Sequence, residues 1–159
     1  PIPKGWESVL FIDDEIDIVA SMKFRLGQFG YRITGYTDPG EALLHLRRNP
    51  GKYNLIITDR VMPVMTGEKV AAIVSHLVPK IPVIVCSGNN EGLACNDIQK
   101  WGVQLIVNKP YTPLDLGWAI RRVMEQVGKS TFPAQNSDGN SAQQAENISG
   151  LGKVAGSVN

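Results

Sequence analysis

The chain has 159 residues, of which 43% are hydrophobic, 7% aromatic and 19% charged. Sixteen basic and fifteen acidic residues leave a net charge of +1, which gives no electrostatic reason to expect contact with nucleic acid or an anionic membrane. No apolar run reaches the roughly 18–20 residues of a membrane span, and the first residues lack the pattern of a secretion signal. Cys86 and Cys95 form no CxxC pair, which favours a reducing, cytoplasmic location.

Composition divides the chain into three parts. Residues 1–6 are predicted to be a linker, residues 7–128 one folded domain, and residues 129–159 a flexible tail rich in Ser, Gly, Asn and Gln. The tail has too few apolar side chains to offset the entropy that ordering would cost. The chain starts at Pro1 without a methionine, so we expect an excised or processed fragment.

Short apolar runs alternate with helical patterns within the predicted domain. Five runs are predicted to be strands: Val9–Ile12, Tyr31–Tyr36, Leu55–Thr58, Val83–Cys86 and Gln104–Val107. Four of them are nearly continuous apolar stretches, as is typical of strands covered on both faces. The second run alternates and contains Gly35, which predicts a strand at the edge of the sheet.

Apolar residues at helical spacing lie between these runs. Three stripes follow this spacing, the third less cleanly: Val70, Ile73, Val74 and Leu77; Leu116, Ala119, Ile120 and Val123; Ile16, Val19, Ala20 and Phe24. Asp38, Pro39 and Glu41 have the order that starts a helix. The alternation predicts an α/β fold, a (βα)5 flavodoxin-like, doubly wound five-stranded parallel sheet with strand order 2-1-3-4-5.

Polar residues follow four of the predicted strands. They are Asp13 and Asp14 after the first, Asp59 after the third, Ser87 after the fourth and Lys109 after the fifth. In this fold the carboxyl ends of the strands meet at one rim, and ligands bind where the strand order reverses. Three nearby carboxylates need a counter-charge, and hard oxygen ligands suit Mg²⁺.

Lys109 and Ser87 supply an ammonium group and a hydroxyl at the same rim. Both can stabilise the negative charge of a phosphoryl group. A carboxylate such as Asp59 can form an acyl phosphate when a metal neutralises the incoming group. A lone aspartate at the end of a strand is more often a helix cap or a turn residue than a nucleophile, but capping does not require Lys109 and Ser87 at the neighbouring strand ends. The residues together therefore predict phosphorylation of Asp59.

The sequence resembles the receiver domain of two-component response regulators over about residues 6–127. Four segments carry the resemblance: Phe11–Glu15, Asp59–Gly67, Cys86–Gly88 and Asn108–Tyr111. The resemblance implies that Asp59 is the phosphoacceptor and that a histidine kinase or a His-containing phosphotransfer domain is the donor. It also implies that Asp14, Asp59 and the Val61 carbonyl bind Mg²⁺ directly, and that Asp13 binds it partly through water. The resemblance further implies that Ser87 and Lys109 contact the phosphoryl oxygens. It also implies that the Lys109–Pro110 bond is cis.

One position departs from the family pattern. Receiver domains usually have Tyr or Phe three residues before the lysine as a switch side chain, and here the residue is Ile106. We therefore expect the response to phosphorylation in the loop of residues 88–92 instead. The surface of the fourth helix, fifth strand and fifth helix, including Trp118, is the expected output face and a candidate homodimer interface.

Two contexts and two other functions remain open from the sequence. Residues 1–8 resemble the linker before the C-terminal receiver of a hybrid sensor histidine kinase, and the alternative is a stand-alone single-domain regulator. A Mg²⁺-dependent aspartyl-phosphate phosphatase is disfavoured, because Val61 occupies the place of its second aspartate. A pseudo-receiver that only binds is disfavoured by the complete set of acidic residues and Lys109. The only catalysis expected is the domain's own phosphorylation and dephosphorylation.

Overall fold

A computed structural model describes residues 1–88 and 95–131. The strands within these residues are β1 (Ser8–Ile12), β2 (Arg32–Tyr36), β3 (Leu55–Asp59), β4 (Val83–Ser87) and β5 (Leu105–Asn108). The helices are α1 (Ile16–Gln28), α2 (Pro39–Arg48), α3 (Gly67–Val74), α4 (Cys95–Lys100) and α5 (Pro113–Thr131). The predicted tail from residue 132 onward, and most of the loop of residues 88–92, lie outside the described residues.

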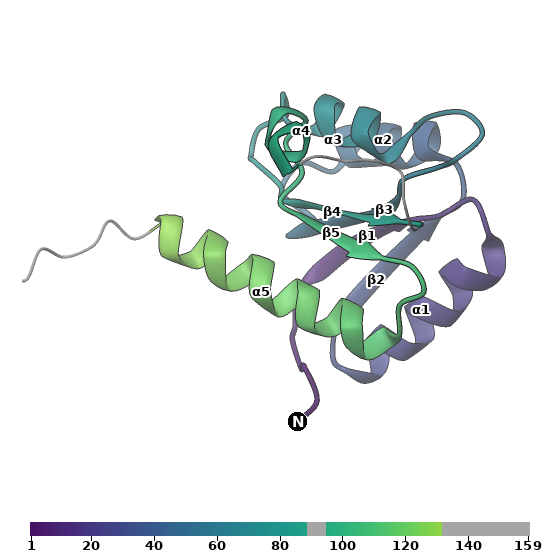
Figure 1. The fold of residues 1–159 in the computed structure, drawn as a ribbon, viewed down its shortest axis with the longest axis vertical. Coiled ribbons are helices and arrows are strands. Elements are labelled where there is room, and N and C mark those ends of the chain that lie inside the picture. Colours follow the sequence, from purple (N-terminus) through teal and green to yellow (C-terminus); the bar gives the residue numbers. More distant parts are fainter. Residues whose placement is uncertain (89–94, 132–159) are drawn as a thin grey trace, which may run out of the picture.

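The strands form one parallel sheet in the order β2-β1-β3-β4-β5 (Figure 1). The register pairs Ile12 with Tyr36 and with Thr58, and Asp59 with Cys86. The prediction of a flavodoxin-like doubly wound sheet is confirmed. The order reverses between β1 and β3, which places the expected site at the carboxyl ends of these two neighbouring strands.

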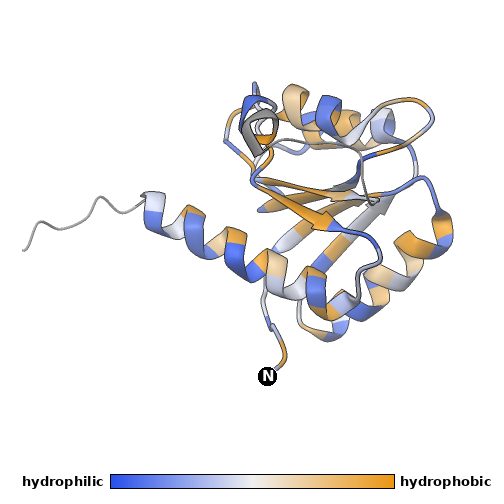
Figure 2. Ribbon diagram, in the orientation of Figure 1, coloured by the Kyte–Doolittle hydropathy of each residue, from blue (hydrophilic) through white to orange (hydrophobic). Residues whose placement is uncertain are grey.

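Helices cover the sheet on both faces (Figure 1). Side chains alternate along a strand, so Val9 and Phe11 pack with α1 and α5, whereas Leu10 and Ile12 pack with α2 and α3. Ile98 of α4 packs on this second face as well. Figure 2 shows the result as hydrophobic strands between helices that are hydrophobic on one side and hydrophilic on the other.

Helix α1 buries a different face from the one that its periodicity predicts. Val19, Met22 and Leu26 are buried against the sheet, whereas Ile16 and Phe24 are 65% and 63% exposed. The helix contains two apolar stripes, and the stripe that meets β1 and β2 is the one with Met22 and Leu26. The predicted core stripe of α1 is therefore wrong except for Val19.

The two edges of the sheet differ from its centre. β2 lies at one edge, as Gly35 predicts. β5 lies at the other edge, and its apolar side chains are only half-buried, although its continuous apolar sequence predicts cover on both faces. Trp118 of α5 is also largely exposed.

Residues 1–7, which we call the N-terminal strap, pack onto the domain. The backbone N–H of Gly5 donates to the carbonyl of Phe29 at 3.0 Å, and the hydroxyl of Tyr31 donates to the carbonyl of Pro3 at 2.8 Å. Pro3 lies so close to Gly117 of α5 that a Cβ at Gly117 would be 2.5 Å from the Pro3 ring. The strap therefore connects α5 to the turn between α1 and β2.

Candidate functional site

Three carboxylates meet at the carboxyl ends of β1 and β3, as the sequence predicts. Asp59 is the last residue of β3, and Asp13 and Asp14 directly follow β1. Carboxylate oxygens of the three residues lie within 4.8 Å of one another. Asp13 and Asp59 are buried, whereas Asp14 is exposed. The group is therefore open to solvent on the side of Asp14.

Lys109 supplies the positive charge that faces this group. Its Nζ lies 2.9 Å from Oδ1 of Asp59. Burial lowers the pKa of Lys109, but the hydrogen bond to Asp59 and the charges of Asp59 and Asp13 raise it more, so the net shift is upward. The backbone N–H of Lys109 donates to the Ser87 carbonyl at 2.7 Å, and the Lys109–Pro110 bond is cis, as the resemblance implies.

The charged form of the Asp13 carboxylate is disfavoured at this site. Burial raises the pKa of Asp13 to about 6, and the charges of Asp59 and Asp14 act in the same direction. The backbone N–H of Glu15, at 2.9 Å from Oδ1, and the charge of Lys109 oppose this shift without cancelling it. Burial and the neighbouring carboxylates therefore outweigh the single lysine, and the charged form of Asp13 stays disfavoured.

The carboxylate cluster fits Mg²⁺. Mg²⁺ takes hard oxygen donors, usually one or two carboxylates together with several waters, and this cluster offers three carboxylates with one side open for water. The uncompensated charge at Asp13 is an independent sign that a cation would be favourable here. Asp13, Asp14 and Asp59 are the residues that would hold it.

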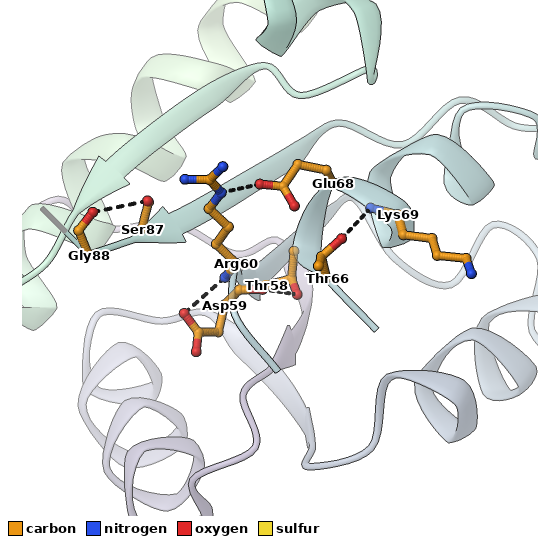
Figure 3. Close-up of polar contacts among 8 residues, drawn as sticks. All are labelled: Thr58, Asp59, Arg60, Thr66, Glu68, Lys69, Ser87 and Gly88. Carbon is orange, nitrogen blue, oxygen red and sulfur yellow. Dashed lines mark hydrogen bonds and ion pairs between the residues drawn. The ribbon is translucent and has the colours of Figure 1, made fainter. Parts of the chain in front are cut away.

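The remaining predicted site residues lie around the cluster. Ser87 is the last residue of β4, next to β3, and its buried hydroxyl donates to the Gly88 carbonyl at 3.2 Å (Figure 3). Val61 lies two residues after Asp59, in the loop between β3 and α3, and its side chain is 60% exposed.

The contacts that Arg60 makes beside Asp59 were not predicted from the sequence. The backbone N–H of Arg60 donates to Oδ1 of Asp59 at 2.9 Å, and its side chain extends away from that carboxylate to form an ion pair with Glu68 (Figure 3). The sequence pattern does not predict this ion pair, because an arginine and a glutamate eight residues apart across a loop have no fixed spatial relationship. Only the fold brings them together.

A comparison with sequence models of protein families identifies the family of this chain. The family model of the response regulator receiver domain matches residues 9–121. The chain belongs to this family. The match begins after the N-terminal strap and includes Asp13, Asp14, Asp59, Ser87 and Lys109.

Related proteins agree with the assignment to receiver domains. The chain is 26% identical over 106 residues to the phosphoglycerate transport system transcriptional regulatory protein PgtA of Salmonella typhimurium, with 67% of this chain and 25% of PgtA covered. It is 30% identical over 122 residues to the two-component response regulator ORR5 of Oryza sativa subsp. japonica, with 76% of this chain and 90% of ORR5 covered. The chain spans about a fifth to a half of the length of the first curated relatives that it matches.

Solved structures show the same fold. The crystal structure of a response regulator receiver domain protein from Clostridium thermocellum superposes with a TM-score of 0.71 at 26% identity, and the match covers 77% of this chain and 97% of that one. Ile106, three residues before Lys109, is half-buried and packs on the face of the sheet that α2 and α3 cover. Within the described residues, no helix is both long and apolar enough to cross a membrane.

Proposed function

We propose that this receiver domain accepts a phosphoryl group on Asp59 from the phosphohistidine of a histidine kinase or a His-containing phosphotransfer domain, with Mg²⁺ as cofactor. One observation carries the proposal. The carboxylate of Asp59 lies within 4.8 Å of two further carboxylates and 2.9 Å from Lys109 Nζ, at the carboxyl end of a central strand. This set combines a nucleophile, a cation site and a fixed positive charge.

The chemistry is an in-line transfer of a phosphoryl group from the donor histidine to the acceptor Asp59. An oxygen of Asp59 forms a bond to phosphorus while the bond from phosphorus to the imidazole nitrogen breaks, and the nitrogen keeps the electron pair. Both hydrogen bonds to Asp59 engage Oδ1, so we assign Oδ2 as the attacking oxygen. Water later attacks the acyl phosphate, which releases inorganic phosphate and restores the carboxylate.

The residues of the chain orient and stabilise the transferred group. Lys109 holds a positive charge next to Asp59, and the Ser87 hydroxyl at the neighbouring strand end can donate to a phosphoryl oxygen once it turns from the Gly88 carbonyl. Asp14, Asp59 and the Val61 carbonyl, with Asp13 partly through water, would hold Mg²⁺. The ion would neutralise charge on the phosphoryl oxygens.

Helix α1 offers a docking surface for the donor. Ile16 begins the helix two residues after Asp14, and Ile16 and Phe24 are exposed apolar side chains two turns apart on one face. A donor that delivers its histidine to Asp59 would pass over this end of α1. We therefore propose that the donor protein packs an apolar surface against Ile16 and Phe24.

We also propose that the domain works as the C-terminal receiver of a hybrid sensor histidine kinase. The strap resembles the linker of such proteins in sequence, and it connects to the domain through Pro3, Gly5 and Tyr31. An antibody against this domain tests the context in cells. A product much larger than the 159-residue chain is expected, and a product of only that size would favour a stand-alone regulator.

Phosphorylation by a small donor tests the main proposal. Incubation of the chain with acetyl phosphate and Mg²⁺ is expected to add one phosphoryl group, measured by intact mass, and the group is expected to be lost in base. Asp59→Asn should gain none. Asp38→Asn is a matched control, because Asp38 caps α2 far from the cluster in sequence and its asparagine can still cap. Phosphorylation of Asp59→Asn at the level of the wild type would overturn the assignment.

A further inference from the structure

The loop between β3 and α3 is closed at its base by Arg60. The backbone N–H of Gly67, the first residue of α3, donates to the Arg60 carbonyl at 2.8 Å. A Cβ at Gly67 would lie 2.6 Å from the Asp59 carbonyl oxygen and 3.1 Å from the Cα of Arg60, so α3 begins directly against this peptide. The backbone therefore holds both ends of the loop of residues 61–66.

A side-chain ion pair also joins the two ends of this loop. Nε of Arg60 donates to Oε1 of Glu68, in the first turn of α3 (Figure 3). The two side chains are only 16% and 13% exposed. At this burial a charge pair is held firmly, because loss of either member leaves the other charge poorly solvated.

We infer that the Arg60–Glu68 pair is a clasp that positions the loop of residues 61–66 for Mg²⁺ binding. The inference rests on the proposed function, because the loop contains the Val61 carbonyl, one residue beyond Arg60. Val61 and Val64 are exposed and give the outer part of the loop little packing, whereas Met62 is buried. The clasp therefore fixes the base of a loop whose outer part has little packing of its own. Arg60 and Glu68 are positioning residues, since neither touches the metal.

Loss of loop positioning and loss of charge predict opposite effects of Arg60→Gln on the affinity for Mg²⁺. Removal of the positive charge of Arg60 near a cation site would by itself tighten Mg²⁺ binding, and removal of the negative charge of Glu68 would weaken it. If the pair positions the loop, Arg60→Gln and Glu68→Gln both weaken binding. The sign of the effect of Arg60→Gln distinguishes the two causes.

Isothermal titration of Mg²⁺ into the unphosphorylated 159-residue chain is the test. We expect each single variant to bind about tenfold more weakly, at the lower end of what loss of an outer partner of a metal site costs. The double variant should be no weaker than either single one, because both remove the same pair. Glu41→Gln, the same change in the first turn of α2 at an exposed position, should leave the affinity unchanged.

Hydrogen exchange without metal provides a second readout. Residues 61–66 should exchange faster in both single variants than in the wild type, with β1 and β4 unchanged. If Glu68→Gln does not fold, Arg60→Lys keeps the charge but loses the Nε contact and should show the same two effects. Unchanged or tighter Mg²⁺ binding by Arg60→Gln, or unchanged exchange at residues 61–66, would overturn the clasp. A wild type that binds no Mg²⁺ would instead overturn the proposed function, and the exchange measurement would still decide whether the clasp exists.

Discussion

The guanidinium of Arg121 in α5 forms an ion pair with the carboxylate of Glu7, just before β1. Side-chain exposure is 24% for Arg121 and 4% for Glu7. Nε of Arg121 also donates to the Tyr31 hydroxyl at 3.0 Å, which in turn donates to the Pro3 carbonyl. One arginine thus connects α5 to the N-terminal strap and to the start of β2. Residues 1–7 are part of the folded unit for this reason.

Glu7→Gln is expected to lower the free energy of unfolding by about 2 kcal/mol at neutral pH, because it removes a charged hydrogen-bond partner from a partly buried arginine. Urea unfolding followed by circular dichroism measures the loss. Glu41→Gln, at an exposed position on α2, should change stability little. A loss no larger than that of Glu41→Gln would show that the ion pair does not stabilise the fold.

The same variant predicts a pH dependence. Burial raises the pKa of Glu7, but hydrogen bonds from Arg121 and from the backbone N–H groups of Glu7 and Trp6 lower it more, so the folded value lies below the ordinary 4.5. The unfolded chain therefore binds more protons between these two values, and stability rises with pH there. The stabilisation is complete above 4.5 and is lost as pH falls through the lower folded value. The difference between wild type and Glu7→Gln should shrink with acidification over that interval.

Two glycines test how closely the strap is packed. Gly117→Ala would place a Cβ 2.5 Å from the Pro3 ring, whereas Gly27→Ala, on α1, would meet nothing within 4 Å. Both lie in helices, where alanine gains up to about 1 kcal/mol over glycine. Gly27→Ala should therefore raise the melting temperature, and Gly117→Ala should lower it. An increase in both would mean that the strap yields without cost.

Asp13→Asn is expected to stabilise the metal-free domain. Burial and two neighbouring carboxylates raise the pKa of Asp13 from 3.8 to about 6, so its charge at neutral pH costs about 3 kcal/mol on the folded side. Asparagine keeps an acceptor for the Glu15 N–H. Denaturant unfolding without Mg²⁺ should show the gain, and Asp14→Asn, at an exposed position, should gain less. Mg²⁺ should stabilise the wild type more than Asp13→Asn. A less stable Asp13→Asn would contradict the electrostatic account of the site.

Phe24→Gln is expected to slow phosphotransfer from a phosphohistidine protein about tenfold, as for the loss of an apolar contact in an interface. Phosphorylation by acetyl phosphate should not change, because this donor needs no docking surface. Leu44→Gln, at a similarly exposed apolar position on α2, is the matched control. Equal effects of Phe24→Gln on both donors would place the defect in the site and not in docking.

The strand order and the residues of the rim could be predicted from the amino-acid sequence. The apolar runs of β1, β3 and β4 and the helical stripe of α5 are long enough that local pattern and tertiary packing agree. Parallel strands joined by right-handed crossovers then bring Asp13, Asp59 and Lys109 together, because each lies at or directly after the carboxyl end of a strand. The contribution of Asp59 and Asp14 to the raised pKa of Asp13 could be anticipated from this clustering, but its largest cause, burial, could not.

The choice between two apolar stripes on α1 depends on the packing of the whole domain and could not be predicted from the sequence. Both Val19 and Phe24 fit a helical period, and the choice depends on which face meets the side chains of β1 and β2. The same holds for the contacts of Arg60 with Glu68 and of Arg121 with Glu7. An ion pair across a loop or between distant segments leaves no periodic signal. Its partners are set by the backbone positions that packing of the whole domain imposes.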